Sequence, residues 1–109
     1  MITIGDKMID MIEINISNGI LTQINVLVLY QKKICYINNK KYSIDDLFLK
    51  QLTDILYTFK NEYGTSQGID VEEFTINVHS KDKIDVYHGK GVFPANYVML
   101  KKLLGDIYE

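Results

Sequence analysis

Residues 43–64 read SIDDLFLKQLTDILYTFKNEYG and have the pattern of an amphipathic helix. Ser43 is a suitable N-cap, and Gly64 suits the left-handed conformation in which helices often end. A helix of about five turns needs an apolar surface to lie on, so the rest of the chain is expected to supply a sheet. Apolar residues recur in the stretch at three- and four-residue spacing and define one helix face: Ile44, Phe48, Leu52, Ile55, Leu56, Phe59 and Tyr63.

The segments before this helix have the patterns of strands. Residues 11–17 alternate isoleucine with polar residues, as a half-buried strand does. Residues 20–30 include the continuous apolar run VLVL at 26–29, which predicts a central strand covered on both faces. Residues 34–37 predict a third strand, followed by a short return into the helix.

Two hairpins are expected, and each is predicted with a three-residue loop. Asn18-Gly19 marks the first, and pairing Ile16 with Ile20 keeps its apolar positions on one face. In the second hairpin, the same logic pairs Val78 with Val86.

A second helix is expected after Pro94, which suits a first helical turn, with an apolar stripe of Tyr97, Leu100, Leu104 and Ile107. The order is therefore β-β-β-(β)-α-β-β-α in a single domain over residues 1–109. We predict an α+β two-layer sandwich: a mostly antiparallel sheet of about five strands with both helices on one face. The uncovered face is then expected to carry Glu13, Asn15, Tyr36, Asn77, His79, Asp85 and Tyr87.

The composition of the 109 residues, 47% hydrophobic and 24% charged, is that of an ordinary globular domain. All positive charge comes from twelve lysines, and the formal net charge is −2. The absence of arginine disfavours bidentate recognition of phosphate or guanine. No apolar run approaches the length of a membrane helix, and the acidic N-terminal region lacks a signal-peptide pattern. With Cys35 as the only cysteine, we expect a cytoplasmic protein.

Catalytic and metal sites have little support in the sequence. Cys35 could serve as a nucleophile with His79 or His88, but it lies between apolar residues of a strand, where cysteine is usually buried. Asp85 could join the two histidines around a metal, yet the predicted hairpin places His79 opposite Asp85 and leaves His88 on the other face. We therefore expect no catalytic residue, metal or cofactor.

Two weaker signals concern anions and nucleic acids. A glycine-containing turn before the second helix has the ingredients of an anion site: Gly89, Lys90 and Gly91. Lysines at two neighbouring turns, with tyrosines nearby, resemble a single-strand binding surface, although turn lysines more often protect sheet edges: Lys32, Lys33, Lys40 and Lys41.

Tyrosine is abundant, with eight residues and no tryptophan, and it is enriched at protein interfaces. The leading hypothesis is a small non-enzymatic protein-binding domain, either an inhibitor or immunity-type protein or a subunit of an assembly, with self-association as a homodimer included. It would use an edge strand or the open sheet face through Tyr36, Tyr87, His79 and Asp85. The alternatives are nucleic-acid binding at the lysine turns and, second, anionic-ligand binding or an enzymatic role at residues 89–94.

Overall fold

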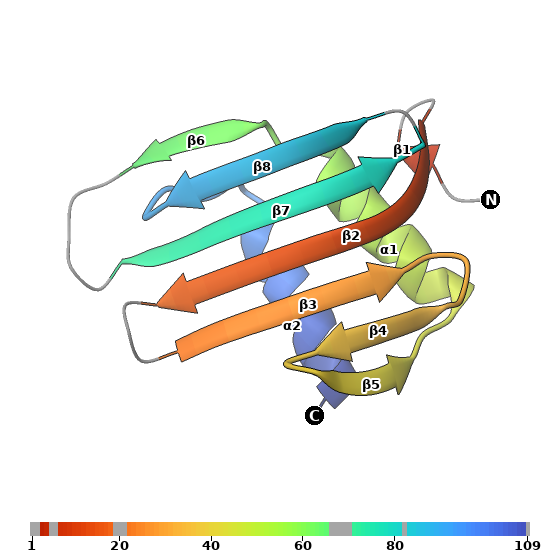
Figure 1. The fold of residues 1–109 in the computed structure, drawn as a ribbon. Helices are drawn as coiled ribbons and strands as arrows, with labels where there is room; N and C mark the ends of the chain where they lie inside the picture. The colour runs from red at the N-terminus through yellow and green to blue at the C-terminus, as the bar shows by residue number, and fades with distance from the viewer. Residues whose placement is uncertain (1–2, 5–6, 19–21, 66–70, 82, 109) are drawn as a thin grey trace.

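A computed structural model describes residues 3–4, 7–18, 22–65, 71–81 and 83–108 of the chain. In these residues, a mostly antiparallel sheet has the strand order β5-β4-β3-β2-β7-β8-β6, and β1 pairs with β2 outside this path (Figure 1). The strands are β1 (Thr3–Ile4), β2 (Lys7–Asn18), β3 (Thr22–Leu29), β4 (Ile34–Ile37), β5 (Lys40–Ser43), β6 (Glu62–Thr65), β7 (Glu72–Ser80) and β8 (Ile84–Lys90).

Two helices, α1 (Asp46–Tyr57) and α2 (Tyr97–Tyr108), lie on the same face of this sheet (Figure 1). The predicted α+β two-layer architecture is confirmed. The sheet has more strands than predicted because short strands form at both edges, β5 and β6. No helix of the described residues is long and apolar enough to span a membrane.

The core lies between the two layers. Alternate residues of the central strands form the sheet side of the core, and one apolar stripe of each helix forms the helix side. The predicted stripe of α2 is confirmed, since Tyr97, Leu100 and Leu104 are buried and Ile107 packs against the same core. The largest fully buried side chains are Phe74, Ile12, Ile14, Leu49, Leu52, Leu56, Ile76, Leu100, Val28, Val78 and Cys35.

Helix α1 begins later than predicted. Asp45, not Ser43, is its N-cap, with the carboxylate accepting from the Phe48 N–H at 2.9 Å. Ser43 instead ends β5 and pairs with Ile34. Strand pairing of β5 with β4 holds Ser43 in the sheet, so the helix begins after Asp45.

Helix α1 also ends earlier. The Thr58 N–H closes the last turn on the Ile55 carbonyl at 3.2 Å, and Tyr63 and Gly64 belong to the edge strand β6. Gly64 has the positive φ expected for a helix end, 83°, but it lies in β6, at the point where the strand register shifts between Glu62 and Thr65. Tyr63 still packs against the core from its strand, which explains why it fitted the helical stripe.

The first hairpin has a different register from the predicted one. Ile16 pairs with Ile24, not with Ile20, and the loop residues 19–21 lie outside the described residues. This register sets Val26 opposite Ile14, so apolar side chains of both strands meet on the helix-covered face. The predicted pairing kept like residues together, but it set the VLVL run opposite residues 7–10, outside the predicted strand at 11–17.

The second hairpin is shifted by one residue. Val78 pairs with Asp85, not with Val86, around a connection closed by the Ser80 N–H on the Lys83 carbonyl at 2.9 Å. Tyr87 is consequently on the helix-covered face, where its ring meets Phe59 edge-on at 6.3 Å. A one-residue shift exchanges the two faces of a strand.

Pro94 precedes α2 and does not lie in its first turn. Its carbonyl accepts from the Tyr97 N–H at 3.1 Å, and α2 starts at that tyrosine. Proline thus sets the approach to the helix from outside it.

Candidate functional site

The open face of the sheet, away from both helices, divides into an apolar half and a polar half. Cross-strand pairing aligns its side chains in rows, and two adjacent rows contain seven apolar residues. We define the apolar half as Met11, Leu27, Leu29, Ile34, Tyr36, Ile84 and Val86. The next two rows form the polar half: Asn15, Ser17, Gln23, Asn25, Glu73, Thr75, His88 and Lys90.

The apolar half has a continuous part on β2, β3 and β4 and a separate part on β8. Leu29 pairs with Met11 on one side and Ile34 on the other, and Leu27 pairs with Tyr36. On β8, Ile84 and Val86 are 56% and 45% exposed, and the five other members are half-buried by their neighbours. No helix of the described residues lies over this face (Figure 1).

A histidine–glutamate pair, with Asn77 beside it on β7, separates Ile84 and Val86 from the five other apolar residues. His79 Nε2 lies 2.5 Å from Glu13 Oε1, and both side chains come from the middle of the sheet, on β7 and β2. Glu13 is the cross-strand neighbour of Leu27, and His79 is that of Ile84. A partner covering the apolar half would also cover this pair.

A second histidine lies in the polar half. His88 Nε2 is 2.8 Å from Glu73 Oε2, and its Nδ1 is 3.1 Å from Glu62 Oε1. Hydrogen bonds to Glu73 and then to Glu62 favour the charged ring and raise the pKa of His88. The bond with His88 in turn lowers the pKa of the Glu62 carboxyl.

The predicted partner-binding residues separate into two groups. Tyr36 and His79 are on the open face as expected. Tyr87 and Asp85 are not, because the β8 register places them on the helix-covered side; Tyr87 is only 8% exposed, and Asp85 forms an ion pair with Lys83 at 3.3 Å. Val86 occupies the open face in their place, beside His88.

Sequence reasoning missed the aliphatic part of this surface, although a signal was present. The VLVL run predicted cover on both sides of β3. The structure covers Val26 and Val28 with the helices, and leaves Leu27 and Leu29 half-buried on the open face.

The four lysines of the nucleic-acid hypothesis do not form one surface. Lys32 and Lys33 lie in the turn before β4, and Lys40 and Lys41 start β5 at the other end of that strand. Adjacent strand residues point to opposite faces, so Lys40 and Lys41 diverge. Lys33 pairs with Asp46 at 3.1 Å, and Lys40 Nζ lies 5.8 Å from the centroid of the Tyr42 ring.

The glycines of the anion hypothesis have structural roles. A Cβ on Gly89 would lie 2.4 Å from the Val92 carbonyl oxygen and 2.6 Å from Phe74 Cε1, so this position needs glycine for close packing. Gly91 has φ 70°, and its N–H donates to the Glu72 carbonyl at 2.8 Å. Lys90 is the cross-strand partner of Glu73.

Next to α2, the Glu72 carboxylate occupies the place that an external anion would take. The Tyr97 hydroxyl donates to Glu72 Oε2 at 2.6 Å, and Lys101 Nζ donates to Glu72 Oε1 at 3.0 Å. Burial and the adjacent Glu72 raise the pKa of Tyr97. An external anion would have to displace this carboxylate.

Cys35 faces the core, on the opposite side of the sheet from His79 and His88. It is fully buried, and burial raises the pKa of its thiol to about 11, so a thiolate is disfavoured at neutral pH. Within the described ranges, no group of three or more His, Cys, Asp or Glu side chains could hold a metal ion.

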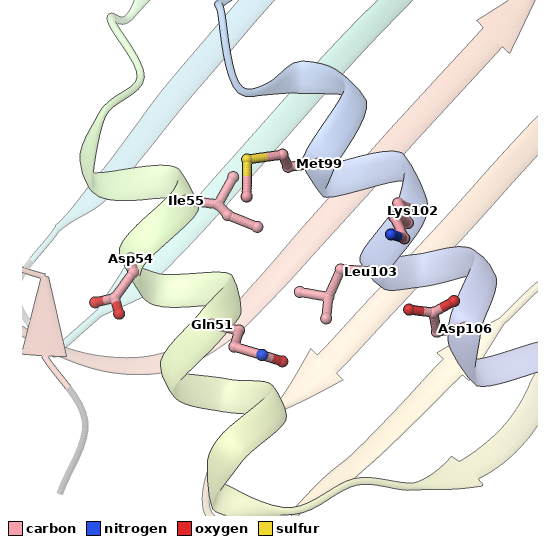
Figure 2. Close-up of a pocket in the computed structure, with 7 residues that line it drawn as sticks. All are labelled: Gln51, Asp54, Ile55, Met99, Lys102, Leu103 and Asp106. Atoms are coloured by element: carbon pink, nitrogen blue, oxygen red, sulfur yellow. The ribbon is translucent and has the colours of Figure 1, made fainter.

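A groove of about 500 Å³ runs between α1 and α2 on the outer surface of the helix layer (Figure 2). Ile55 and Met99 point toward each other across it (Figure 2). Its charges are of both signs, and Asp54 is already paired with Lys50 at 2.9 Å. The groove offers apolar contact without a converging set of polar groups. Its lining residues are Gln51, Asp54, Ile55, Met99, Lys102, Leu103 and Asp106.

Comparison with protein-family models, with curated proteins and with solved structures finds no match for the chain. The function is therefore argued from the chemistry of these surfaces.

Proposed function

We propose that this chain is a small non-enzymatic protein-binding domain that docks a partner on the apolar half of its open sheet face. The observation that carries the proposal is the gathering of seven apolar side chains in two adjacent rows of the open face. Five of them are cross-strand neighbours on β2, β3 and β4, Tyr36 among them, and two lie on β8 beyond His79 and Asn77 of β7. Apolar patches of this kind, bordered by polar residues, mark interaction sites on soluble domains.

The composition of the surface supports a protein partner over a nucleic acid. Aliphatic residues and a tyrosine make up most of the patch, and Glu13 and His79 within it are hydrogen-bonded to each other. Phosphate binding requires clustered cations, whereas the lysines here are spread over two turns and two sheet faces.

The sheet edges support the proposal less than the face does. Both edge strands are only four residues long. Lysines 40 and 41 occupy half of β5, and β6 is irregular between Glu62 and Thr65. Short, charged or irregular edges discourage the addition of another strand.

Two roles are compatible with this proposal: an inhibitor or immunity-type protein, and a subunit of an assembly. If the chain self-associates, the second copy would bind the same face. The single, buried Cys35 fits a reducing compartment, so we also propose a cytoplasmic location.

The test places one charge in each half of the open face. Leu27→Glu puts a carboxylate in the centre of the apolar half, next to Glu13, and Tyr36→Ala removes its aromatic contact area. Asn15→Glu is the matched control, since it adds the same carboxylate at an exposed position of the polar half.

We expect both apolar-half variants to weaken binding of the co-purifying protein, or self-association measured by light scattering, and the control to bind like wild type. A single interface residue of this type contributes about 1–2 kcal/mol, a loss of roughly tenfold or more in affinity. Equal binding by all variants, with circular dichroism showing native folds, would place the interface elsewhere.

A further inference from the structure

His88 connects three strands through its side chain. It projects from β8 on the open face, between Glu73 of β7 and Glu62 of the edge strand β6. Its Nε2 lies 2.8 Å from Glu73 Oε2 and its Nδ1 lies 3.1 Å from Glu62 Oε1. Both ring nitrogens therefore face a carboxylate oxygen.

Donating a hydrogen bond to both carboxylates requires two ring protons. A neutral imidazole carries one N–H, so it can donate to one carboxylate while its other nitrogen presents a lone pair to the second. The imidazolium donates to both and places its charge between two negative groups. Among the described residues, the other charged group beside this set on the open face is Lys90, which pairs across the strands with Glu73.

The parallel ladder between β6 and β8 is short and irregular, with Glu62 opposite His88 and Thr65 opposite Lys90. Just before β6, the His88 N–H donates to the Asn61 carbonyl at 3.0 Å, and the Asn61 side-chain amide donates to the Val86 carbonyl at 3.0 Å. The Glu62 carboxylate adds the side-chain link to His88, and the same oxygen accepts from the Gly64 N–H at 3.2 Å. Glu62 thus joins the irregular backbone of β6 to the histidine.

We propose that His88 is a proton-dependent clasp that fastens edge strand β6 to β8. When the ring loses one proton to solvent, the remaining proton stays on Nε2, which makes the shorter contact with Glu73. Nδ1 then faces Glu62 with a lone pair, and the link to β6 is lost. β6 opens more often, and the backbone groups of β8 at His88 become accessible. This device is independent of docking on the apolar half.

The backbone amide of His88 reports on the clasp: it donates to the carbonyl of Asn61, the residue directly before β6, and we expect this bond to break when β6 separates. We would measure its solvent exchange by NMR from pH 6 to 9, dividing by the intrinsic rate at each pH to obtain a protection factor. In wild type, we expect protection to fall about two- to fivefold as the ring deprotonates, the range for an exposed charged contact.

Three variants isolate the cause. His88→Gln should show the lower protection at every pH. Glu62→Gln should flatten the pH dependence, since an amide can donate to a neutral ring as well as accept from a charged one. His79→Gln is the control, because it removes the other histidine–glutamate pair of the open face and should leave the His88 amide unchanged.

A protection factor independent of pH in wild type would overturn the clasp, as would an identical pH dependence in His88→Gln. The ring itself gives a second measurement that needs no variant: ¹⁵N shifts should show both His88 nitrogens protonated at the acidic end of the titration and the proton lost from Nδ1 as pH rises. Loss of the Nε2 proton instead would equally overturn the proposal.

Discussion

Replacing Gly89 with alanine should destabilise the fold by overpacking the join between β8 and the segment that leads to α2. The new methyl group would lie 2.4 Å from the Val92 carbonyl oxygen and 2.6 Å from Phe74 Cε1. Neither neighbour can yield easily, since one is backbone and the other belongs to a fully buried ring. The strand and the following segment must move apart.

The magnitude follows from the number and type of these clashes. Overpacking in a well-packed core costs about 1–3 kcal/mol, and a backbone atom among the clashing groups places this variant in the upper half, about 2–3 kcal/mol. Gly105→Ala in α2 is the matched control, because its Cβ would meet nothing within 4 Å. Alanine should stabilise that helical position by about 0.5–1 kcal/mol.

Urea unfolding followed by circular dichroism measures both free energies of unfolding. The two substitutions add the same methyl group and are predicted to change stability in opposite directions. If Gly89→Ala were as stable as wild type, the close approach of Val92 and Phe74 described above would be wrong.

Three further predictions concern single groups. Asp45→Ala should lower the free energy of unfolding by about 1 kcal/mol through loss of the N-cap, whereas Ser43→Ala should change it by less than about 0.5 kcal/mol in the same urea experiment. Cys35 should resist a thiol reagent at pH 8 in the native protein and react only on unfolding, in a colorimetric assay; rapid native reaction would contradict its burial. The raised pKa of His88 should add stability that is complete below about pH 6.5 and is lost as pH rises through the folded pKa, measured as the difference between wild type and His88→Gln; a difference that grows with pH would have the wrong sign.

Features governed by local periodicity were predictable from the sequence. The stripe of α2 from Tyr97 to Ile107 and the alternation of residues 11–17 each depend on one element meeting one apolar layer, and the two-layer architecture follows from them. The ends of α1 were less predictable, since Tyr63 can reach the same aromatic cluster from a helix or from a strand. Its ring in β6 lies 6.4 Å from Phe59.

The register of the paired strands could not be predicted from the sequence near each turn, because loop length depends on contacts with residues far away in the chain. In the second hairpin, the observed register lets Tyr87 pack against Phe59, which lies between α1 and β6, and the sequence of the turn does not contain that information. The one-residue error placed Tyr87 and Asp85 on the open face in the prediction and concealed Val86 and His88. Tyr36 and His79 were correctly placed because β4 and β7 each had the right parity.

The candidate surface was visible in the sequence only in part. A continuous apolar run at 26–29 indicated cover on both sides of β3, and the helices cover only one. Leu27 and Leu29 became part of a patch when pairing brought Met11, Ile34 and Tyr36 beside them, which requires the sheet order. Glu13 also lies within the patch, and this charged residue lowers the mean hydropathy of the strand segment that contributes to it.

The measurement that tests the central claim most directly is capture from the native host with tagged wild type, Leu27→Glu and Asn15→Glu, together with the solution mass of each. We predict that wild type and Asn15→Glu retain the same stoichiometric protein, or form the same dimer, and that Leu27→Glu loses it. Retention by all three proteins, or by none, would contradict a binding role for the apolar half of the open face.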